Sequence, residues 1–305
     1  MQETEFIWMN GKLVPWKQAT THFLTHSLHY GTAVFEGIRC YNTEKGPAVF
    51  RLKEHVKRLF DSAHIMQMPV PFNQQQITAA INQVVKENKL KECYIRPLIY
   101  YGYGIMGLAT KGVKVDVGIA AWPWGTYLGD EGIRNGIRMK IASVVRHHPN
   151  IMMTKSKTSA NYANSTMAKM EAINAGYDEA IMLDPNGFVS ECSGENIFIV
   201  RNGVLMTPPT SNALEGITRA SIIEVAKDEG IEVKEPLFPR DTLYIADEAF
   251  LTGTAAEVTP IREVDSRVIG DGKPGPITKK LQAKFFGIVN GKEKKYEKWL
   301  DYISK

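Results

Sequence analysis

The sequence predicts an α+β protein made of two domains. The chain has 305 residues, about twice the length of a common domain. In its first half, strand-like runs alternate with amphipathic helical patterns, whereas its second half carries short strand-like runs separated by turn signals. We expect a smaller N-terminal α/β domain over 1–122, an interdomain loop over 123–132 and a larger β-rich domain with helices over 133–305.

The first half begins with a hairpin, because 6–9 and 12–16 flank an Asn-Gly dipeptide. Further strands are expected at 48–51, 93–101 and 115–122, where β-branched and aromatic residues gather.

Two helices are expected between these strands. One begins at Leu52, and its apolar residues recur at helical spacing up to Ala63, which leaves Arg58 off the apolar stripe. The second follows Asn73 and carries apolar residues at the same spacing up to Leu90.

The second half reads as a meander followed by helices and a strand pair. Asp-Pro-Asn-Gly and Asn-Gly turns separate four strand candidates: 179–183, 188–191, 196–200 and 204–206. A helix is expected from Gly216, strands at 249–251 and 258–261, and a last helix from about 277.

The composition excludes several classes of protein. Hydrophobic residues make up 44% and charged residues 23%, as in ordinary globular proteins. The net charge of +4 is small and evenly spread, so nucleic acid is not an expected partner. No apolar run is long enough to span a membrane, and no signal peptide is visible. Three cysteines without a CxxC pair fit a reducing compartment, so we expect a cytoplasmic enzyme.

Two motifs suggest sites that other features disfavour. Gly102–Gly107 satisfies GxGxxG, but a strand follows it instead of the helix that a dinucleotide site needs. His22, His26 and His29 could share a helical face, but no carboxylate completes a metal site, so structural roles are favoured. Cys192 is more simply a buried apolar residue than a reactive thiol.

Two segments of the second half could bind an anion. The helix that begins near Gly216 has small residues at its start, where free N–H groups and the helix dipole favour negative charge. The small-residue turn 252–256 could also present N–H groups. Ordinary capping and an ordinary tight turn are the alternatives for each segment alone.

Six blocks in order give the chain a family resemblance. They are 30–41 (YGTAVFEGIRCY), 94–97 (YIRP), 157–162 (KTSANY), 191–198 (ECSGENIF), 215–219 (EGITR) and 253–260 (GTAAEVTP). Together they resemble the branched-chain amino acid aminotransferases, which have fold type IV of the pyridoxal phosphate enzymes, as D-amino-acid aminotransferase does. The resemblance spans nearly the whole chain and implies this two-domain fold.

The resemblance implies pyridoxal 5'-phosphate as cofactor. Lys157 matches the Schiff-base lysine, which also carries protons. Glu191 matches the carboxylate facing the pyridine nitrogen, Tyr162 the phenol at the ring oxygen, and Arg58 the phosphate-binding arginine. The other cofactor-binding positions are Gly194, Leu214, Gly216, Ile217, Thr218 and Thr254.

The resemblance also implies how the substrate is held. Thr254 and Ala255 match the turn that receives the α-carboxylate, and Arg96 matches the residue that accepts the distal carboxylate of glutamate. The remaining substrate positions are Tyr30, Phe35, Gly37, Tyr94, Leu108, Trp124, Tyr127 and, as a wall, Tyr162. Tyr30 and Leu108 reach in from a neighbouring subunit in such enzymes, so a homo-oligomer of at least two subunits is implied.

The implied reaction is transamination of L-leucine, L-isoleucine and L-valine with 2-oxoglutarate, so the partners are small amino acids and 2-oxo acids. The alternative is a D-amino-acid or (R)-amine transaminase, because these enzymes share the lysine and the glutamate. The sequence departs from the family at Glu215, where proline is common, and at Ser159 and Ala160, where glycines are common.

Overall fold

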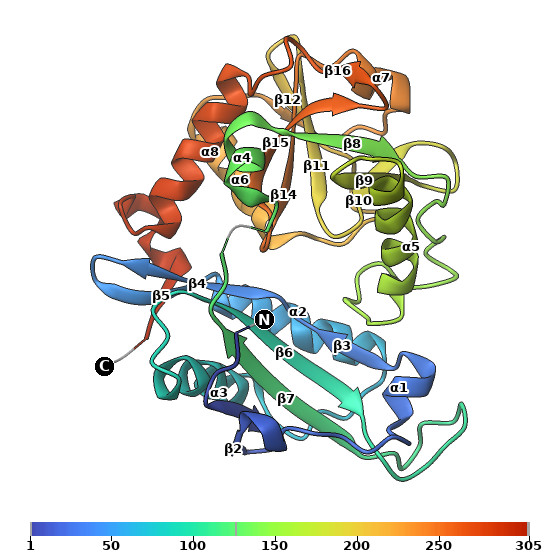
Figure 1. Ribbon diagram of the computed structural model, residues 1–305, viewed down its shortest axis with the longest axis vertical. Helices are drawn as coiled ribbons and strands as arrows, with labels where there is room; N and C mark the ends of the chain where they lie inside the picture. Colours follow the sequence, from blue (N-terminus) through green and yellow to red (C-terminus); the bar gives the residue numbers. More distant parts are fainter. Residues whose placement is uncertain (1, 126, 304–305) are drawn as a thin grey trace. The chain divides into compact units, whose positions relative to one another are not determined.

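The computed structural model describes residues 2–125 and 127–303 (Figure 1). The chain forms two compact units. The N-terminal unit comprises Met1–Gly125, Ser156–Ala160 and Ile288–Lys305, and the C-terminal unit comprises Thr126–Lys155 and Asn161–Gly287. The chain leaves the N-terminal unit inside the predicted loop 123–132, of which Thr126 lies outside the described residues. The predicted domains are continuous in sequence, whereas Ser156–Ala160 and Ile288–Lys305 belong with the first unit.

The N-terminal unit is built on one antiparallel sheet with the order β17-β5-β4-β6-β7-β1-β2, and β3 pairs with β6. The strands are β1 (Phe6–Met9), β2 (Lys12–Pro15), β3 (Ala33–Phe35), β4 (Ile38–Thr43), β5 (Gly46–Phe50), β6 (Cys93–Tyr101), β7 (Val115–Trp122) and β17 (Leu300–Tyr302). The helices are α1 (His26–Tyr30), α2 (Leu52–Ile65) and α3 (Gln74–Glu87), with short 3-10 turns η1 (Trp16–Gln18) and η2 (Lys294–Trp299). The predicted hairpin, the long strands β6 and β7 and both helices are confirmed.

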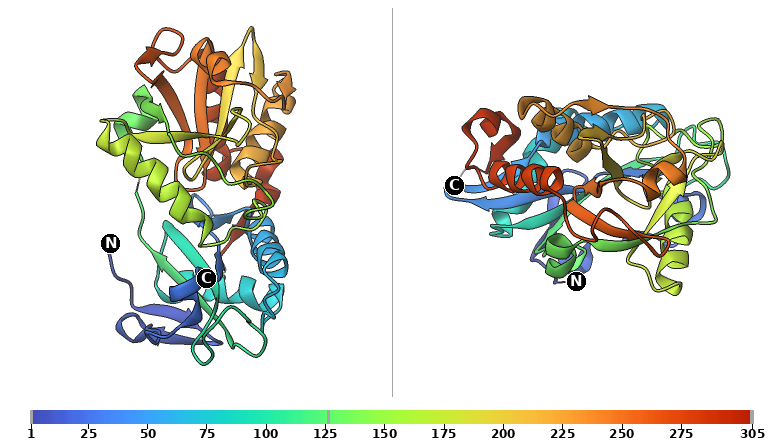
Figure 2. Two further views of the ribbon diagram at one scale, coloured as in Figure 1. Left: turned by 90° about the vertical axis from the view of Figure 1, so that its right-hand side faces the viewer. Right: turned by 90° about the horizontal axis from the view of Figure 1, so that it is seen from above.

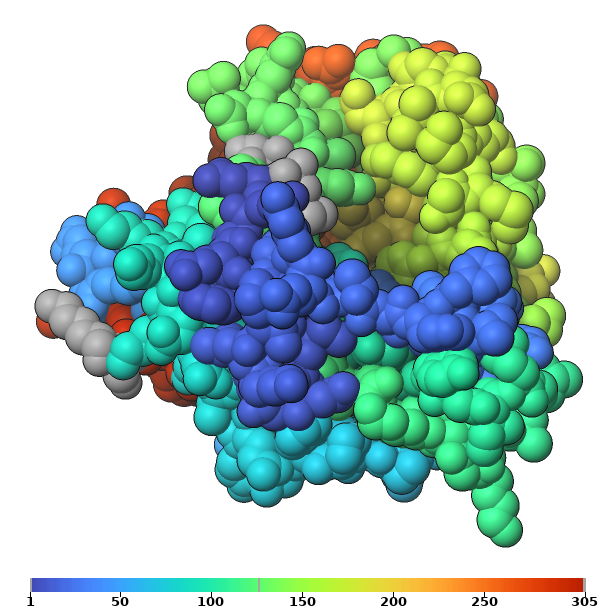
Figure 3. Space-filling model, turned by 60° about the horizontal axis from the view of Figure 1, so that its bottom comes forward, coloured from blue at the N-terminus to red at the C-terminus, as the bar shows by residue number. Residues whose placement is uncertain are grey.

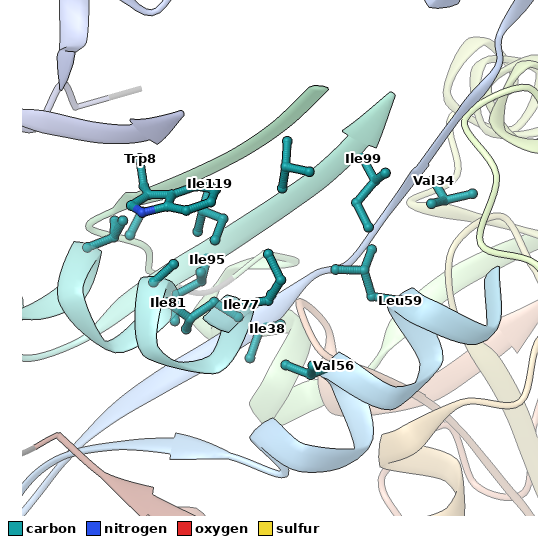
Figure 4. Close-up of a cluster of buried hydrophobic side chains, with 14 of the residues drawn as sticks. Trp8, Val34, Ile38, Val56, Leu59, Ile77, Ile81, Ile95, Ile99 and Ile119 are labelled. Carbon is teal, nitrogen blue, oxygen red and sulfur yellow. The ribbon is translucent and has the colours of Figure 1, made fainter. Parts of the chain in front are cut away.

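Alternating side chains divide this sheet into two faces. One face packs against α2 and α3, and the close-up shows Trp8, Ile95 and Ile99 in that core (Figure 4). The opposite face lines a pocket of about 430 Å³, to which Arg96 and Leu98 contribute. Every second residue of β6 is therefore available to a site instead of to the core.

The start of α3 explains why the helix forms where the sequence predicts it. Asn73 Oδ1 accepts a hydrogen bond from the Gln76 backbone N–H at 2.9 Å, and Gln76 Oε1 accepts one from the Asn73 N–H at 2.8 Å. This reciprocal pair is a capping box, which satisfies two N–H groups that the helix itself leaves unpaired.

The C-terminal unit is built on a mixed sheet with the order β10-β9-β8-β15-β14-β11-β12-β13, and β16 pairs with β15. The strands are β8 (Ile137–Ile141), β9 (Glu179–Leu183), β10 (Val189–Cys192), β11 (Asn196–Arg201), β12 (Val204–Met206), β13 (Val233–Lys234), β14 (Glu248–Gly253), β15 (Glu257–Val264) and β16 (Arg267–Val268). The helices are α4 (Gly129–Asn135), α5 (Asn161–Asn174), α6 (Ile217–Asp228), α7 (Arg240–Tyr244) and α8 (Pro276–Val289), whose last two residues belong to the N-terminal unit.

The predicted meander is wrong in its middle. The turns join β9 to β10 and β11 to β12 as expected, but β10 and β11 are not neighbours, because β8, β15 and β14 lie between the two hairpins. Turn residues specify a local hairpin but carry no information about strands that arrive from distant parts of the chain.

Helix α5 packs on β9 through small side chains, and Figure 2 shows this helix in yellow-green from two further directions. Ala168 and Ala172 of the helix contact Ala180 and Met182 of the strand in a small buried cluster. Tyr162 is the second residue of this helix.

Two expected exclusions can be compared with the described residues. The glycines 102–107 continue as a loop and no helix follows them, so the dinucleotide interpretation has no structural basis. None of the helices within 2–125 and 127–303 has the length and apolar character needed to cross a membrane.

Candidate active site

Lys157 lies in a short segment that is attached to the N-terminal unit. Its backbone N–H donates to Ser62 Oγ at 2.9 Å, and its carbonyl accepts from the Phe35 N–H at 3.1 Å. Thr158 forms a β-bridge with Val34, and the Lys157 ammonium lies 5.1 Å from the centroid of the Phe35 ring. The lysine is therefore held between β3 and α2, with its side chain half-buried against an aromatic wall.

Arg58 lies on the face of α2 that looks toward the same segment. Its Nε donates to Glu36 Oε1 at 2.6 Å and its Nη2 donates to Glu36 Oε2 at 2.9 Å, a bidentate pair. The Glu36 carboxylate is fully buried and also accepts from His55 Nδ1 at 2.7 Å. Burial raises the pKa of the Glu36 carboxyl, but Arg58 and His55 outweigh burial and lower that pKa below its ordinary value.

The open face of the N-terminal sheet carries an aromatic wall. Tyr94 lies with its ring centroid 5.1 Å from that of Trp124 and 5.3 Å from that of Trp122. A Cβ atom on Gly37 would lie 1.9 Å from the Tyr94 hydroxyl oxygen. Only glycine therefore lets Tyr94 pack at this position, which accounts for the Gly in the block around residue 37.

Arg96 is held within this wall. Its guanidinium carbon lies 4.8 Å from the Phe35 ring centroid and 5.4 Å from that of Tyr94. Its Nη2 donates a long 3.4 Å hydrogen bond to the Tyr94 hydroxyl. A half-buried cation between two aromatic rings can accept a carboxylate while the surrounding wall stays apolar.

Glu191 is the corresponding carboxylate of the C-terminal unit. Its Oε1 pairs with Arg146 Nη2 at 2.7 Å, and both side chains are more than nine-tenths buried. Its Oε2 accepts from the Leu214 N–H at 3.1 Å and from Asn196 Nδ2 at 3.3 Å. Asn196 Nδ2 also donates to the Leu214 carbonyl at 3.1 Å, so the carboxylate is fixed to the segment that leads into α6.

The start of α6 has the features of an anion site. Gly216 is the N-cap residue and none of the described side chains caps the helix, so the first-turn N–H groups that begin with Ile217 and Thr218 have no intrahelical acceptor. A Cβ atom on Gly216 would lie 1.9 Å from Asn196 Oδ1. Glycine thus allows the helix start to approach the Glu191 cluster closely.

The turn 254–256 lies beside a second small-residue loop. It joins β14 to β15, and Thr254 and Ala255 are half-buried. A Cβ atom on Gly253 would come within 3.7 Å of the Gly194 carbonyl oxygen. The predicted positions Gly194, Thr254 and Ala255 therefore gather at the same end of the sheet as Asn196, whose strand partner is Thr252.

The remaining predicted residues lie at the surface or at the edges of the units. Tyr162 is the second residue of α5 and is half-buried, and the Tyr127 ring lies 5.6 Å from the Lys169 ammonium. Tyr30 is 38% exposed and Leu108 is 85% exposed. A bridge between Thr25, which precedes α1, and Tyr103 joins the segment of Tyr30 to the loop of Leu108.

The structure also describes the surroundings of His26, Cys192 and Glu215, which the sequence had marked for other reasons. His26 is buried and its ring nitrogens contact Thr32 Oγ1 and the Gly107 carbonyl, and no group of metal-ligating side chains occurs within the described residues. Burial raises the pKa of the Cys192 thiol well above its ordinary value, which makes it unreactive. Glu215 forms an ion pair with Lys155 at 2.9 Å and is largely exposed.

Five residues of the site were not among those predicted from the sequence: Glu36, His55, Ser62, Arg146 and Asn196. A signal existed on α2, where His55, Arg58 and Ser62 are spaced three and four residues apart and so share one helical face. No comparable signal marks Arg146, because only the fold brings it to Glu191.

Comparisons with known proteins show the family of the chain. Residues 33–264 match the family described as amino-transferase class IV. The branched-chain-amino-acid aminotransferase of Pseudomonas aeruginosa is 53% identical over 96% of this chain and 95% of its own. The structure of a T.th. branched-chain amino acid aminotransferase with pyridoxamine 5'-phosphate is 49% identical, covers all of both chains and has a TM-score of 0.97. A complex of that enzyme with N-(5'-phosphopyridoxyl)-L-glutamate is 47% identical over all of both chains, with a TM-score of 0.96. The chain belongs to the class IV aminotransferases and, within them, to the branched-chain-amino-acid aminotransferases.

Proposed function

We propose that this branched-chain aminotransferase transfers the amino group of L-leucine, L-isoleucine and L-valine to 2-oxoglutarate with Lys157 as the catalytic lysine. The observation that carries the proposal is the placement of Lys157 against Phe35 in a segment fixed by Ser62. The structural relatives contain pyridoxamine 5'-phosphate and a phosphopyridoxyl-glutamate adduct, which supports pyridoxal 5'-phosphate as the cofactor of this chain.

The residues present fit that cofactor. The uncapped N-terminus of α6 presents N–H groups that can bind a phosphate. Glu191 is a buried carboxylate that can face a protonated ring nitrogen, and Arg146 and Asn196 hold it in one orientation. Lys157 supplies the primary amine that the cofactor aldehyde needs.

Each residue has a chemical role that follows from its surroundings. Bound pyridoxal 5'-phosphate supplies the electron-withdrawing ring that makes the α-proton of an amino acid removable. Lys157, when neutral, accepts that proton on Nζ and would then deliver it to the cofactor carbon that is to carry the amino group. Arg58 and the α6 N–H groups bind the phosphate, Tyr162 binds the ring oxygen, and Thr254 and Ala255 bind the α-carboxylate. Arg96 accepts the second carboxylate of glutamate or 2-oxoglutarate.

One wall must accept both leucine and glutamate. Phe35, Tyr94 and Trp124 provide apolar surface, and Arg96 provides a single cation between two of these rings. A leucine side chain contacts the rings, whereas a glutamate side chain reaches the guanidinium. The blocks 30–41 and 253–260, together with Arg96, favour the L-branched-chain reaction over the D-amino-acid and (R)-amine alternatives.

We also propose a homo-oligomer of at least two subunits. Figure 3 shows the segment around α1 in blue beside the loop that follows β6 in teal on the surface. Large apolar side chains are exposed on these segments, namely Phe23, Leu28, Tyr103 and Leu108. Exposed apolar clusters of this kind mark protein interfaces. Tyr30 and Leu108 lie on the same segments, and the resemblance implies that both reach into a neighbouring subunit.

Three unpaired, buried thiols support the cytoplasm as the location of the enzyme.

A substrate panel tests the proposed reaction. Initial rates with 2-oxoglutarate are measured for L-leucine, D-alanine and (R)-1-phenylethylamine. We expect the L-leucine rate to exceed both others by at least about tenfold, a difference of about 1.4 kcal/mol. A higher rate with D-alanine or the amine would assign the alternative function.

Sedimentation of wild type and Leu108→Asp tests the oligomer, and a wild type that sediments as a monomer would refute it.

A further inference from the structure

We propose that Glu36 and His55 are positioning residues that fix the Arg58 guanidinium for the cofactor phosphate, so that Arg58 acts by its orientation more than by its charge. This inference rests on the proposed function, because it concerns the phosphate end of the same cofactor.

The first step is the geometry of the Arg58–Glu36 pair. Glu36 engages Nε and Nη2 of Arg58 at 2.6 and 2.9 Å, and its carboxylate is fully buried. A guanidinium has five N–H donors in one plane. A bidentate pair occupies one edge of that plane and so sets the direction of the remaining donors. The Arg58 side chain is 13% exposed, so little solvent competes for them.

The second step concerns how Glu36 itself is held. Its backbone N–H donates to the Pro97 carbonyl at 3.0 Å, which places the residue between β3 and β4. His55 Nδ1 contacts Glu36 Oε2 at 2.7 Å, and because a carboxylate only accepts, this nitrogen carries the proton. His55 and Arg58 are three residues apart on α2, so side chains on one face of the helix donate to both carboxylate oxygens of Glu36.

The third step concerns charge. Burial lowers the pKa of the His55 ring, and the Arg58 and Lys157 charges lower it further, against the raising effect of Glu36. A neutral His55 leaves Glu36 as the counter-ion of Arg58, and the pair then carries no net charge. The net charge of the pair then attracts a phosphate little, so the direction of the Arg58 N–H groups matters more.

The same helix face also holds the catalytic lysine. Ser62, four residues after Arg58, accepts the Lys157 N–H at 2.9 Å, and its own carbonyl accepts from the Ser156 hydroxyl at 3.2 Å. Helix α2 therefore sets the spacing between the phosphate arginine and the cofactor lysine, and Glu36 fixes the arginine end of that spacing.

Measurements of cofactor affinity distinguish a role of Glu36 in orienting Arg58 from a purely electrostatic role. Equilibrium dialysis of the full-length holoenzyme gives Kd for pyridoxal 5'-phosphate and, after exchange, for pyridoxal, which lacks the phosphate. Glu36→Gln removes a negative charge near the phosphate, so a purely electrostatic role predicts tighter binding of pyridoxal 5'-phosphate. The positioning role predicts binding weaker by about 10- to 100-fold, the effect of one lost hydrogen bond between charged groups. The Kd for pyridoxal should stay within about threefold.

A double-mutant cycle keeps the proposal falsifiable if Glu36→Gln destabilises the fold. In an Arg58→Met background, Glu36→Gln should produce no further loss of phosphate-dependent affinity, because the group that it positions is absent. His55→Asn retains a donor near Nδ1 and should preserve most of the affinity that His55→Leu loses. Circular dichroism confirms that each variant is folded before dialysis.

The outcomes divide clearly. Tighter or unchanged binding of pyridoxal 5'-phosphate by folded Glu36→Gln overturns the proposal, as does an equal loss for pyridoxal or an additive effect in the Arg58→Met background. If wild type binds pyridoxal 5'-phosphate no better than pyridoxal, the cofactor assignment fails instead, so the two failures are distinguishable.

Discussion

Replacing Gly216 by alanine should disrupt the junction between the carboxylate cluster and the start of α6. Gly216 has φ −66°, so alanine introduces no backbone strain, and the whole effect is steric. The new Cβ would lie 1.9 Å from Asn196 Oδ1, which must move away. Overpacking of this kind destabilises by about 1–3 kcal/mol. Moving Asn196 also loses the Nδ2 hydrogen bond to Glu191, about 1.5–3 kcal/mol.

The combined destabilisation is about 2.5–6 kcal/mol, which for a unit of this size lowers Tm by about 5–24 °C. Differential scanning calorimetry of the cofactor-free protein measures it without a contribution from bound ligand. Gly194→Ala is the matched control, because its Cβ would meet none of the described atoms within 4 Å. We expect the control to change Tm by less than about 2 °C. If Gly216→Ala melts with the control and wild type, Asn196 is not packed against this glycine and the described helix start is wrong.

Three further changes test other parts of the structure. Arg96→Gln should raise KM for 2-oxoglutarate by about 10- to 100-fold and KM for L-leucine much less, and equal effects in steady-state assays would contradict its assignment. Gly37→Ala should displace the Tyr94 ring and raise KM for L-leucine by about tenfold or more in the same assays, and an unchanged KM would argue against the aromatic wall. Burial and the Arg146 charge lower the pKa of His147 in the folded protein to about 4. As pH falls from about 6.5 to 4, the unfolded state therefore binds more protons than the folded state, and the free energy of unfolding declines. In urea unfolding at a series of pH values, His147→Gln should flatten that decline, whereas His148→Gln at the exposed neighbouring position should not. If the free energy of unfolding depends on pH in the same way in both variants, His147 is not the cause of the decline.

Local pattern was sufficient for the elements that local interactions specify. The helix that follows Asn73 and the strands β6 and β7 occur at the expected positions because their signals lie within a few residues of one another. The partners of β10 and β11 could not be read in this way, since strands from distant parts of the chain separate the two hairpins.

The site shows the same division. The anion site proposed at the start of α6 followed from small residues before an amphipathic helix, and the structure adds that none of the described side chains caps this helix. Lys157 could not be distinguished from other lysines by its sequence surroundings, and only the family resemblance selected it. The Glu36 and Arg146 ion pairs join residues far apart in sequence, so no spacing rule could have found them.

The roles proposed here depend above all on which lysine holds the cofactor. Borohydride reduction of the holoenzyme fixes the cofactor to its lysine, and digestion with mass spectrometry of the peptides locates it. Lys155 is an internal comparison two residues away, and its ammonium is paired with Glu215 and the Thr210 carbonyl. We expect the pyridoxyl label on Lys157 and none on Lys155. A label on Lys155, or on any lysine other than Lys157, would contradict it.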